Sequence, residues 1–282
     1  MINSIVGRKL ALIGLFFLIT FCMVSASWAG PLDSFSGEKG DIKISGGTAH
    51  IPVMKDAAKN IMNYNNDISI SIAGGGSGVG IKQVGEGLVD IGNSGRKPKD
   101  GEISKYGLKI FKWAIDGVGV VVNPENKVNS LKTQQLVDIF SGKIDNWKSL
   151  GGIDKQINVY TRDNSSGTRE VFWKKGLNEG EITNKANFVV SNGAMKSAIA
   201  NDPYGIGYVS VGHIDESVLP VTLDGVLPDI TNIKNGSYKI ARGLYSNTKG
   251  EPQGLAKKFI EYMFSTEGQQ IVIKQGFVSV NQ

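Results

Sequence analysis

From Asp41 onward, short runs of alternating or continuous apolar residues, typical of β-strands, are followed by stretches with apolar residues every three or four positions, typical of helices. The first set reads "DIKISG", then a helical stretch that includes Met54 and Ile61, then "ISISIAG", a glycine-rich turn with "GIKQVGEGL", and "VDIG". The order βαβαβ predicts a parallel sheet with helices on its faces.

A second set of the same kind starts at "DGVGVVVNP" and ends at "GIGYVSV". Between them we expect the strands "INVYT" and "NFVVS", and helices over Thr133–Phe140, from about Thr168, and over Gly193–Ala200. After the loop-like "DGVLPDITNIKNG", the chain gives a further strand, "YKIARGLYSNT", and a helix over Gln253–Gln275. The pattern predicts two α/β units and leaves open whether the last strand and helix return to the first.

The first 29 residues have the composition of a secretory signal. Arg8 and Lys9 precede the apolar run Leu10–Phe21, and small residues flank Trp28 in Ser27-Trp28-Ala29. The apolar run is shorter than the roughly 20 residues of a membrane-spanning helix. We therefore expect cleavage after Ala29 and an exported, periplasmic protein, with residues 30–40 as a weakly ordered leader.

Cys22 is the only cysteine, which makes a lipoprotein the alternative. The bulky Phe21 before it disfavours lipid attachment, which requires a small residue there. Cleavage after Ala29 removes this cysteine, so the mature protein has neither disulfide nor thiol chemistry.

The mature chain is mildly basic. Two of the 31 basic residues and none of the 26 acidic ones lie in the signal segment, which leaves a net charge of +3. This balance suits an anionic ligand. The lysines are scattered, without long basic runs or interleaved aromatic residues, so a nucleic-acid surface is not expected.

Three segments share one arrangement, a strand followed by a turn rich in Gly, Ser or Thr and then by a helix. They are "ISGGTAHIP" (Ile44–Pro52), "AGGGSGVGIKQV" (Ala73–Val84) and "YTRDNSSGTREVF" (Tyr160–Phe172). The unpaired N–H groups of such helix starts point out from the carboxyl edge of the sheet, where α/β proteins bind ligands and where an anion is stabilised.

Side chains in these turns add further donors. Thr48, Ser77, Ser166 and Thr168 supply hydroxyl groups, and Arg162 supplies a planar charged fork that matches two oxygens of one tetrahedral anion. Each turn alone could be no more than a capped helix start, since Ser and Thr are favoured N-caps. Three such turns, one with an arginine, favour an anion site.

Catalytic motifs fit the chain poorly. Gly80 is followed by Ile81 where a P-loop needs lysine, and Ser77 lacks the second glycine of a nucleophile elbow. The only histidines are His50, which we expect in an exposed loop, and His213, which we expect in a turn. They form no metal-ligand spacing with the scattered acids. An exported hydrolase of phosphate esters is therefore a minor alternative, and no cofactor or metal is expected.

Five ordered motifs resemble the phosphate-binding receptor of bacterial phosphate ABC importers. They are "SGGTAH", "GGGSGVGIKQVGEGLVDIGNSGR", "LVDIFSGKIDNW", "YTRDNSSGTREVF" and "PYGIGYVSVG", and the similarity spans nearly all of residues 41–282. The resemblance implies a type II periplasmic binding protein, with two α/β lobes, two crossing strands and a ligand cleft between the lobes. Lobe I would comprise residues 41–116 plus 238–282, and lobe II residues 117–237.

The resemblance also implies the ligand contacts. They are carried over onto Thr48, the backbone of Ala49, Ser77, Arg162, Ser166, Gly167 and Thr168. Asn164 stands where many relatives have an acid that orients the arginine, so Asp163 is the candidate for that role.

A second departure from the family follows the "VDIG" strand. Several relatives carry an Asp or a Ser there that touches the anion, and an Asp can accept the proton of hydrogen phosphate, which sulfate lacks. In this chain Gly95 takes that position, so Ser94 or the backbone of Gly95 is the substitute, with Arg96 nearby. We therefore expect weaker discrimination between phosphate and sulfate.

The function implied is an exported receptor that closes two lobes over inorganic phosphate and delivers it to an ABC permease. Such a receptor performs no chemistry, binds no nucleic acid and acts as a monomer. The alternative within the same architecture is a receptor for another tetrahedral oxyanion, such as sulfate, molybdate or arsenate.

Overall fold

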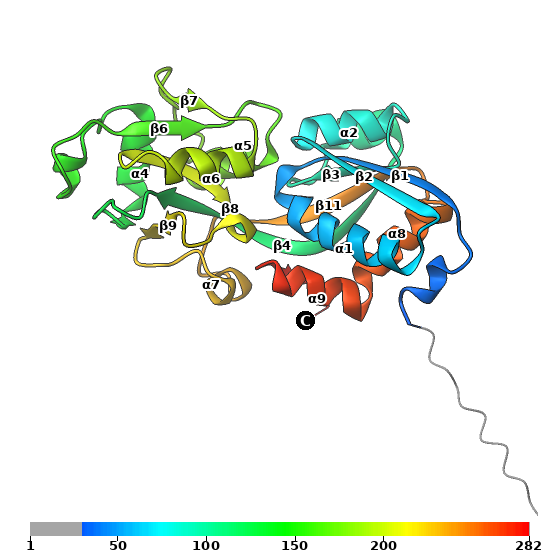
Figure 1. The fold of residues 1–282 in the computed structure, drawn as a ribbon. Helices are drawn as coiled ribbons and strands as arrows, with labels where there is room; N and C mark the ends of the chain where they lie inside the picture. The colour runs from blue at the N-terminus through cyan, green and yellow to red at the C-terminus, as the bar shows by residue number, and fades with distance from the viewer. Residues whose placement is uncertain (1–29, 282) are drawn as a thin grey trace, which may run out of the picture.

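The computed structural model describes residues 30–281, so the expected signal segment lies outside the described residues. One sheet runs through the whole molecule in the order β2-β1-β3-β11-β4-β8-β6-β7 (Figure 1). These strands are β2 (Ile68–Gly75), β1 (Gly40–Gly46), β3 (Ile91–Ser94), β11 (Ala241–Lys249), β4 (Leu108–Val122), β8 (Gly205–Ser210), β6 (Asn158–Thr161) and β7 (Asn187–Phe188). Shorter strands flank this path: β12 (Val278–Ser279), β9 (Leu219–Pro220), and the separate pair β10 (Thr222–Leu223) and β5 (Ser130–Leu131).

Helices cover the sheet in both of its halves. Those beside β1 to β3 are α1 (Ile51–Tyr64), α2 (Ser77–Gly85), α3 (Asp100–Tyr106), α8 (Gly254–Phe264) and α9 (Thr266–Lys274). Those in the other half are α4 (Thr133–Ser141), α5 (Gly167–Lys175), α6 (Asn192–Ala200) and α7 (Ile230–Lys234). No helix within residues 30–281 is long and apolar enough to cross a membrane.

The apolar residues form two main cores, one in each half of the sheet. The first contains Ile44 of β1, Trp113 of β4 and Leu244 of β11, and the second contains Val120 of β4 and Tyr208 of β8. β4 therefore passes from one core into the other. β11 returns the chain to the first core, pairing antiparallel with β4. The structure thus places the last strand and helices with the first α/β unit, which the sequence pattern had left open.

Each unit contains parallel pairs, as predicted, but the expected first strand of the second unit, "DGVGVVVNP", belongs to β4 and pairs antiparallel with β8. β1 pairs in parallel with β2 and β3, and β6 pairs in parallel with β7 and β8. β4 and β11 are antiparallel to their neighbours in the same sheet. The carboxyl ends of β1, β2 and β6 thus lead into the three donor-rich turns.

The segment expected as a weakly ordered leader is packed. Residues Asp33–Phe35 form a 3₁₀ helix, and the ring of Phe35 is completely buried with its edge toward Tyr262, 6.1 Å between centroids. Asn65 donates from Nδ2 to the carbonyl of Phe35 at 2.7 Å. Phe35 fills a space in the first core and so holds the segment in place, and no local pattern predicts the distant residues that it contacts.

The single helix expected over Gln253–Gln275 is two helices, α8 and α9. Ser265 separates them with an extended backbone (ψ 165°), and its hydroxyl accepts a hydrogen bond from the N–H of Gly268. A serine that caps a new helix start is favoured over a continued helix at this point.

Candidate anion-binding site

A small cavity of about 180 Å³ lies between the two halves of the molecule. Its lining comes from the turns after β1, β2, β3 and β6, and from β11. The lining residues are Gly47, Thr48, Ala49, Gly76, Ser77, Gly95, Arg162, Ser166, Gly167, Thr168 and Arg242. A cavity this small suits a small ion, and its lining contains no carboxylate.

Arg162 brings a buried positive charge to this cavity. It follows β6 directly and is 1% exposed. Its Nη2 donates to the carbonyl of Val190 at 3.1 Å, whereas Nε and Nη1 have no partner among residues 30–281. Burial lowers the pKa of the guanidinium below its usual value. A buried cation with unused donors favours an anion in the cavity.

Three hydroxyl groups in the lining already accept hydrogen bonds from the protein. Thr48 Oγ1 accepts from the backbone N–H and Nδ2 of Asn192 at 3.2 and 3.0 Å. Ser77 Oγ accepts from the N–H of Gly95 at 2.9 Å, and Thr168 Oγ1 accepts from Nη2 of Arg242 at 3.0 Å. Each O–H bond therefore remains available for a ligand, so the hydroxyl groups act as donors.

The first turn of α5 adds backbone donors. The helix begins at Gly167, with Ser166 as the N-cap whose hydroxyl accepts from the N–H of Arg169 at 3.1 Å. The N–H groups of Gly167 and Thr168 precede the first helical hydrogen bonds and face the same cavity. A Cβ at Gly167 would lie 2.1 Å from Ser77 Oγ, so glycine is needed for the close approach of α5 to α2.

Of the nine residues expected to bind the anion, eight line the cavity and one does not. Ser94 is buried in β3, and its hydroxyl accepts from Nδ2 of Asn247 at 2.9 Å instead. The eight are Thr48, Ala49, Ser77, Gly95, Arg162, Ser166, Gly167 and Thr168.

Two neighbouring charged residues serve other contacts. Arg96, placed near the anion by the sequence, binds Glu102 with Nη1 and Nη2 at 2.7 Å and contacts Glu170 of α5 through Nε at 3.0 Å. Asp163 accepts from the N–H of Ser165 at 2.7 Å rather than from the guanidinium of Arg162.

The two histidines lie where the chain is tightly packed. His50, expected in an exposed loop, is completely buried with its edge toward Trp113, and burial lowers its pKa to about 3. His213 lies in the expected turn, with Nε2 3.2 Å from the carbonyl oxygen of Thr48. Burial lowers the pKa of His213 to about 4.

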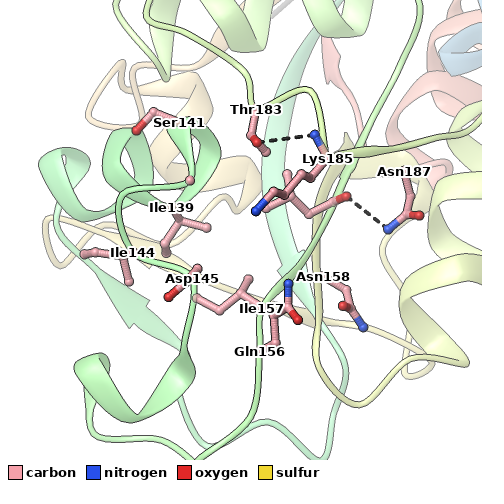
Figure 2. A pocket seen from close by; sticks show the side chains of 12 residues that line it. Ile139, Ser141, Ile144, Asp145, Gln156, Ile157, Asn158, Thr183, Lys185 and Asn187 are labelled. Carbon is pink, nitrogen blue, oxygen red and sulfur yellow. Dashed lines mark hydrogen bonds between the residues drawn. The ribbon is translucent and has the colours of Figure 1, made fainter.

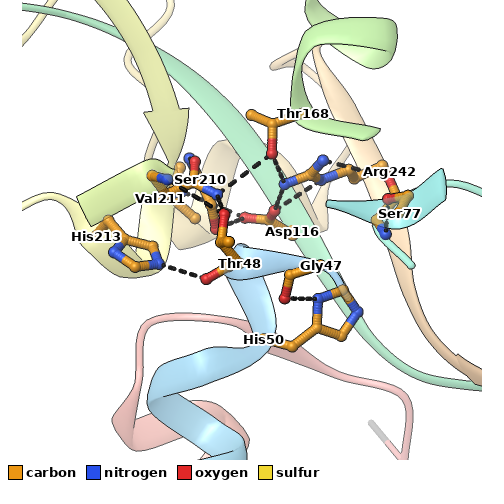
Figure 3. A network of polar contacts seen from close by, with 12 residues as sticks. Gly47, Thr48, His50, Ser77, Asp116, Thr168, Ser210, Val211, His213 and Arg242 are labelled. Atoms are coloured by element: carbon orange, nitrogen blue, oxygen red, sulfur yellow. Dashed lines mark hydrogen bonds and ion pairs between the residues drawn. The ribbon is translucent and has the colours of Figure 1, made fainter. Parts of the chain in front are cut away.

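Arg242 of β11 was not predicted as a site residue. It forms a buried ion pair with Asp116 of β4 and contacts Thr168 (Figure 3). Complete burial raises the pKa of Asp116, an effect that Arg242 opposes. The only signal in the sequence is an arginine between the apolar residues Ile240, Ala241 and Leu244 in "KIARGLY". Such a position favours a paired or functional charge.

Direct contacts join the two halves around the cavity. The N–H of Gly78 donates to the carbonyl of Ser165 at 3.0 Å, and Ser165 Oγ lies 3.1 Å from the carbonyl oxygen of Gly75. The Asn192–Thr48 and Arg96–Glu170 contacts lie on the same junction. The structure is therefore a closed arrangement.

A larger hollow in the second half, of about 600 Å³, is one competing site (Figure 2). It borders Asp145, Asn158, Thr183, Lys185 and Asn187. Lys185 and Asn187 are exposed to solvent, and Asn187 Nδ2 donates to a backbone carbonyl. No buried donor without a partner lies there within the described chain. The small cavity is thus the better ligand site. Residues 30–281 contain no group of three or more His, Cys, Asp or Glu suited to a metal ion.

A family model described as the PBP superfamily domain matches residues 33–267, which gives the class of protein. The chain is 37% identical to the phosphate-binding protein PstS of Bacillus subtilis, covering 97% of this chain and 95% of that protein. A solved structure from Clostridium perfringens, described as a phosphate ABC transporter substrate-binding protein with bound phosphate, aligns with a TM-score of 0.81 at 36% identity. That alignment covers 86% of this chain and all of the other. The chain therefore belongs to the PBP superfamily and, within it, to the phosphate-binding proteins that include PstS, and its fold is a type II periplasmic binding protein.

Proposed function

We propose that this protein captures inorganic phosphate between its two lobes and delivers it to the permease of an ABC importer. The observation that carries the proposal is Arg162, a buried guanidinium in a small cavity lined by donors, with two nitrogens that find no partner in the described part of the chain. The names of the relatives agree, since they are phosphate-binding proteins and one of them holds phosphate.

The proposed ligand residues supply hydroxyl, backbone and guanidinium donors from both lobes. Gly95 borders the cavity without a proposed ligand contact, because its N–H is already bonded to Ser77 and its carbonyl to Arg242. The proposed direct contacts are Thr48, Ala49, Ser77, Arg162, Ser166, Gly167 and Thr168.

Closure of the two lobes over the anion is part of the proposal. Lobe I comprises residues 41–116 plus 238–282 and lobe II residues 117–237, so the chain crosses within β4 and just before β11. Thr48 and Ser77 come from lobe I, whereas Arg162 and Thr168 come from lobe II. One anion bound by both sets of donors favours the closed state.

The protein acts without chemistry, metal or cofactor in this proposal, as a monomer. It is exported after cleavage behind Ala29. The relatives are transport receptors rather than enzymes. A hydrolase would need a base at the cavity, and neither histidine lines it, since His50 and His213 contact the carbonyl oxygens of Gly47 and Thr48 from outside the lining.

One observation favours a second candidate, a receptor for a fully deprotonated oxyanion such as sulfate. The lining has no carboxylate to accept the proton of hydrogen phosphate. The chemistry of the donors is otherwise the same for both anions.

Titration calorimetry of residues 30–282 with phosphate, sulfate, molybdate and arsenate distinguishes these functions. We expect one phosphate per chain, with arsenate as a competitor and sulfate weaker than both. Tighter binding of sulfate or molybdate than of phosphate would reassign the ligand. Incubation with a chromogenic phosphate ester should release no product, and turnover that Arg162→Ala abolishes would instead support the hydrolase.

A further inference from the structure

Arg242 is the second arginine at the cavity, and the proposed function gives it no role. It lies in β11 directly opposite Asp116 of β4, and 8% of the residue is exposed. Both strands run through the junction of the two lobes. The guanidinium therefore sits where the lobes and the ligand cavity meet (Figure 3).

Three segments of the chain hold this guanidinium in place. Nε donates to Asp116 Oδ2 at 2.8 Å, and Nη2 lies 2.8 Å from the same oxygen and donates to Thr168 Oγ1 at 3.0 Å. Nη1 donates to the carbonyl of Gly95 at 3.2 Å. Because Nη1 carries two N–H bonds, one of them has no partner among residues 30–281.

Gly95 leaves the space that the guanidinium occupies. A Cβ at this position would lie 2.6 Å from Nη1 and 2.9 Å from Cζ of Arg242. The wall of the cavity at Gly95 is therefore formed by a cation, and no side chain at position 95 stands between Arg242 and the ligand.

The cavity lining is rich in positive charge and donors and poor in free acceptors. Two guanidinium groups line it, and the counter-ion Asp116 is outside the lining. The oxygens of Thr48, Ser77 and Thr168 already accept hydrogen bonds from the protein. The singly charged form of phosphate carries two O–H groups and the dianion carries one, so the singly charged form needs one acceptor more, and an unpaired O–H in a buried site lowers affinity.

We propose that Arg242 is a second anion-binding arginine that makes the site select the doubly charged form of a tetrahedral oxyanion over its singly charged, more protonated form. For phosphate the selected species is the hydrogen phosphate dianion. The inference rests on the proposed function, because it concerns the same cavity.

The other charged or titratable groups that act on Arg242 are Asp116, Arg162, His50 and His213. Burial lowers the pKa of His50 to about 3 and that of His213 to about 4. Both imidazoles are thus neutral in the closed protein above about pH 5. Asp116 lies behind Arg242, where burial and the ion pair act on its pKa in opposite directions.

The phosphorus-31 resonance of bound phosphate reports the protonation of the ligand itself. We expect the bound resonance of the wild type to stay at the dianion position from about pH 8 to about pH 5, while free phosphate titrates. In Asp116→Asn/Arg242→Gln, which removes both charges of the pair, the bound resonance should move with pH. Affinity at about pH 8 should fall at least tenfold, and by less at about pH 5.

Arg96→Gln is the matched control, since it removes an arginine from the lobe junction that does not line the cavity. It should weaken binding severalfold through its contact with Glu170, with the bound resonance unchanged. If the double variant does not fold, Gly95→Ala tests the same role. Its Cβ pushes the guanidinium of Arg242 away from the cavity wall, although the charged side chain itself is still present. Its bound resonance should then titrate.

A wild-type resonance that titrates, or a folded double variant that keeps the dianion position, overturns the role of Arg242 while phosphate binding itself stands. A wild type that gives no bound resonance at saturating phosphate removes the proposed function and this inference together.

Discussion

Arg162 has two nitrogens without partners within residues 30–281, and it supplies the charge on the lobe II side of the cavity. We expect Arg162→Ala to weaken phosphate binding by about 2 to 5 kcal/mol, because the desolvated anion loses its charged partner. Arg162→Lys should recover only part of this loss, since an ammonium group lacks the planar fork. Titration calorimetry measures both. An alanine variant within twofold of the wild type would place Arg162 outside the site.

Gly95 is the second position where one residue sets the chemistry. In Gly95→Asp a carboxylate enters the cavity and must displace or pair with the guanidinium of Arg242, 2.6 Å from the new Cβ. We expect weaker binding of phosphate and a further tenfold or greater loss for sulfate, which has no proton to donate to the new acceptor. Gly95→Asn, of similar size and uncharged, is the control in competition titrations. A wild type that already ignores a large excess of sulfate would contradict the account.

At the scale of elements, strand–turn–helix units explain how much of the site the sequence could predict. Thr48, Ser77 and Thr168 lie next to a strand end and a helix start, so their places followed from local order alone. Arg242 could not be found in this way, because it meets the cavity only through the pairing of β11 with β4. Ser94 contacts Asn247, which is far along the chain, instead of lining the cavity. The helix break at Ser265 arises because this serine caps a new helix start. Neither feature follows from the order of strands and helices.

The 3₁₀ helices Thr48–His50 and Val211–His213 meet across the lobes through His213 and the carbonyl of Thr48. Burial lowers the pKa of His213 from 6.5 to about 4, so protonation favours the open form. The closed form keeps this stabilisation above about pH 6.5 and loses it as the pH falls toward 4. His213→Gln keeps a donor and cannot be protonated. At about pH 5 we expect the variant to bind phosphate roughly tenfold more tightly than the wild type does, and at about pH 8 we expect the two affinities to be equal. Equal pH profiles would exclude the effect.

At the scale of the whole molecule, the contacts around Ser165, Asn192 and Arg96 describe a closed protein. Without an anion, the like charges of Arg162 and Arg242 repel each other and the donors are unpaired, so we expect the free protein to open. Small-angle scattering should give a smaller radius of gyration with saturating phosphate than without it. Identical profiles would indicate a rigid, preformed cavity.

Because the chain crosses between the lobes twice, the cores of the two lobes are completed at different times during synthesis. The core of lobe II comes almost entirely from residues 118–240 and thus includes Tyr238 and Ile240, just past the proposed lobe boundary. A chain that has emerged to Ile240 contains nearly all of this core. Lobe I needs Leu244, Phe259 and Ile271, which come last from the ribosome. The half that begins the chain is thus the half that is completed second. Until then, the apolar faces of β1 and α1 lack their covering helices, and the incomplete chain is prone to aggregate through them.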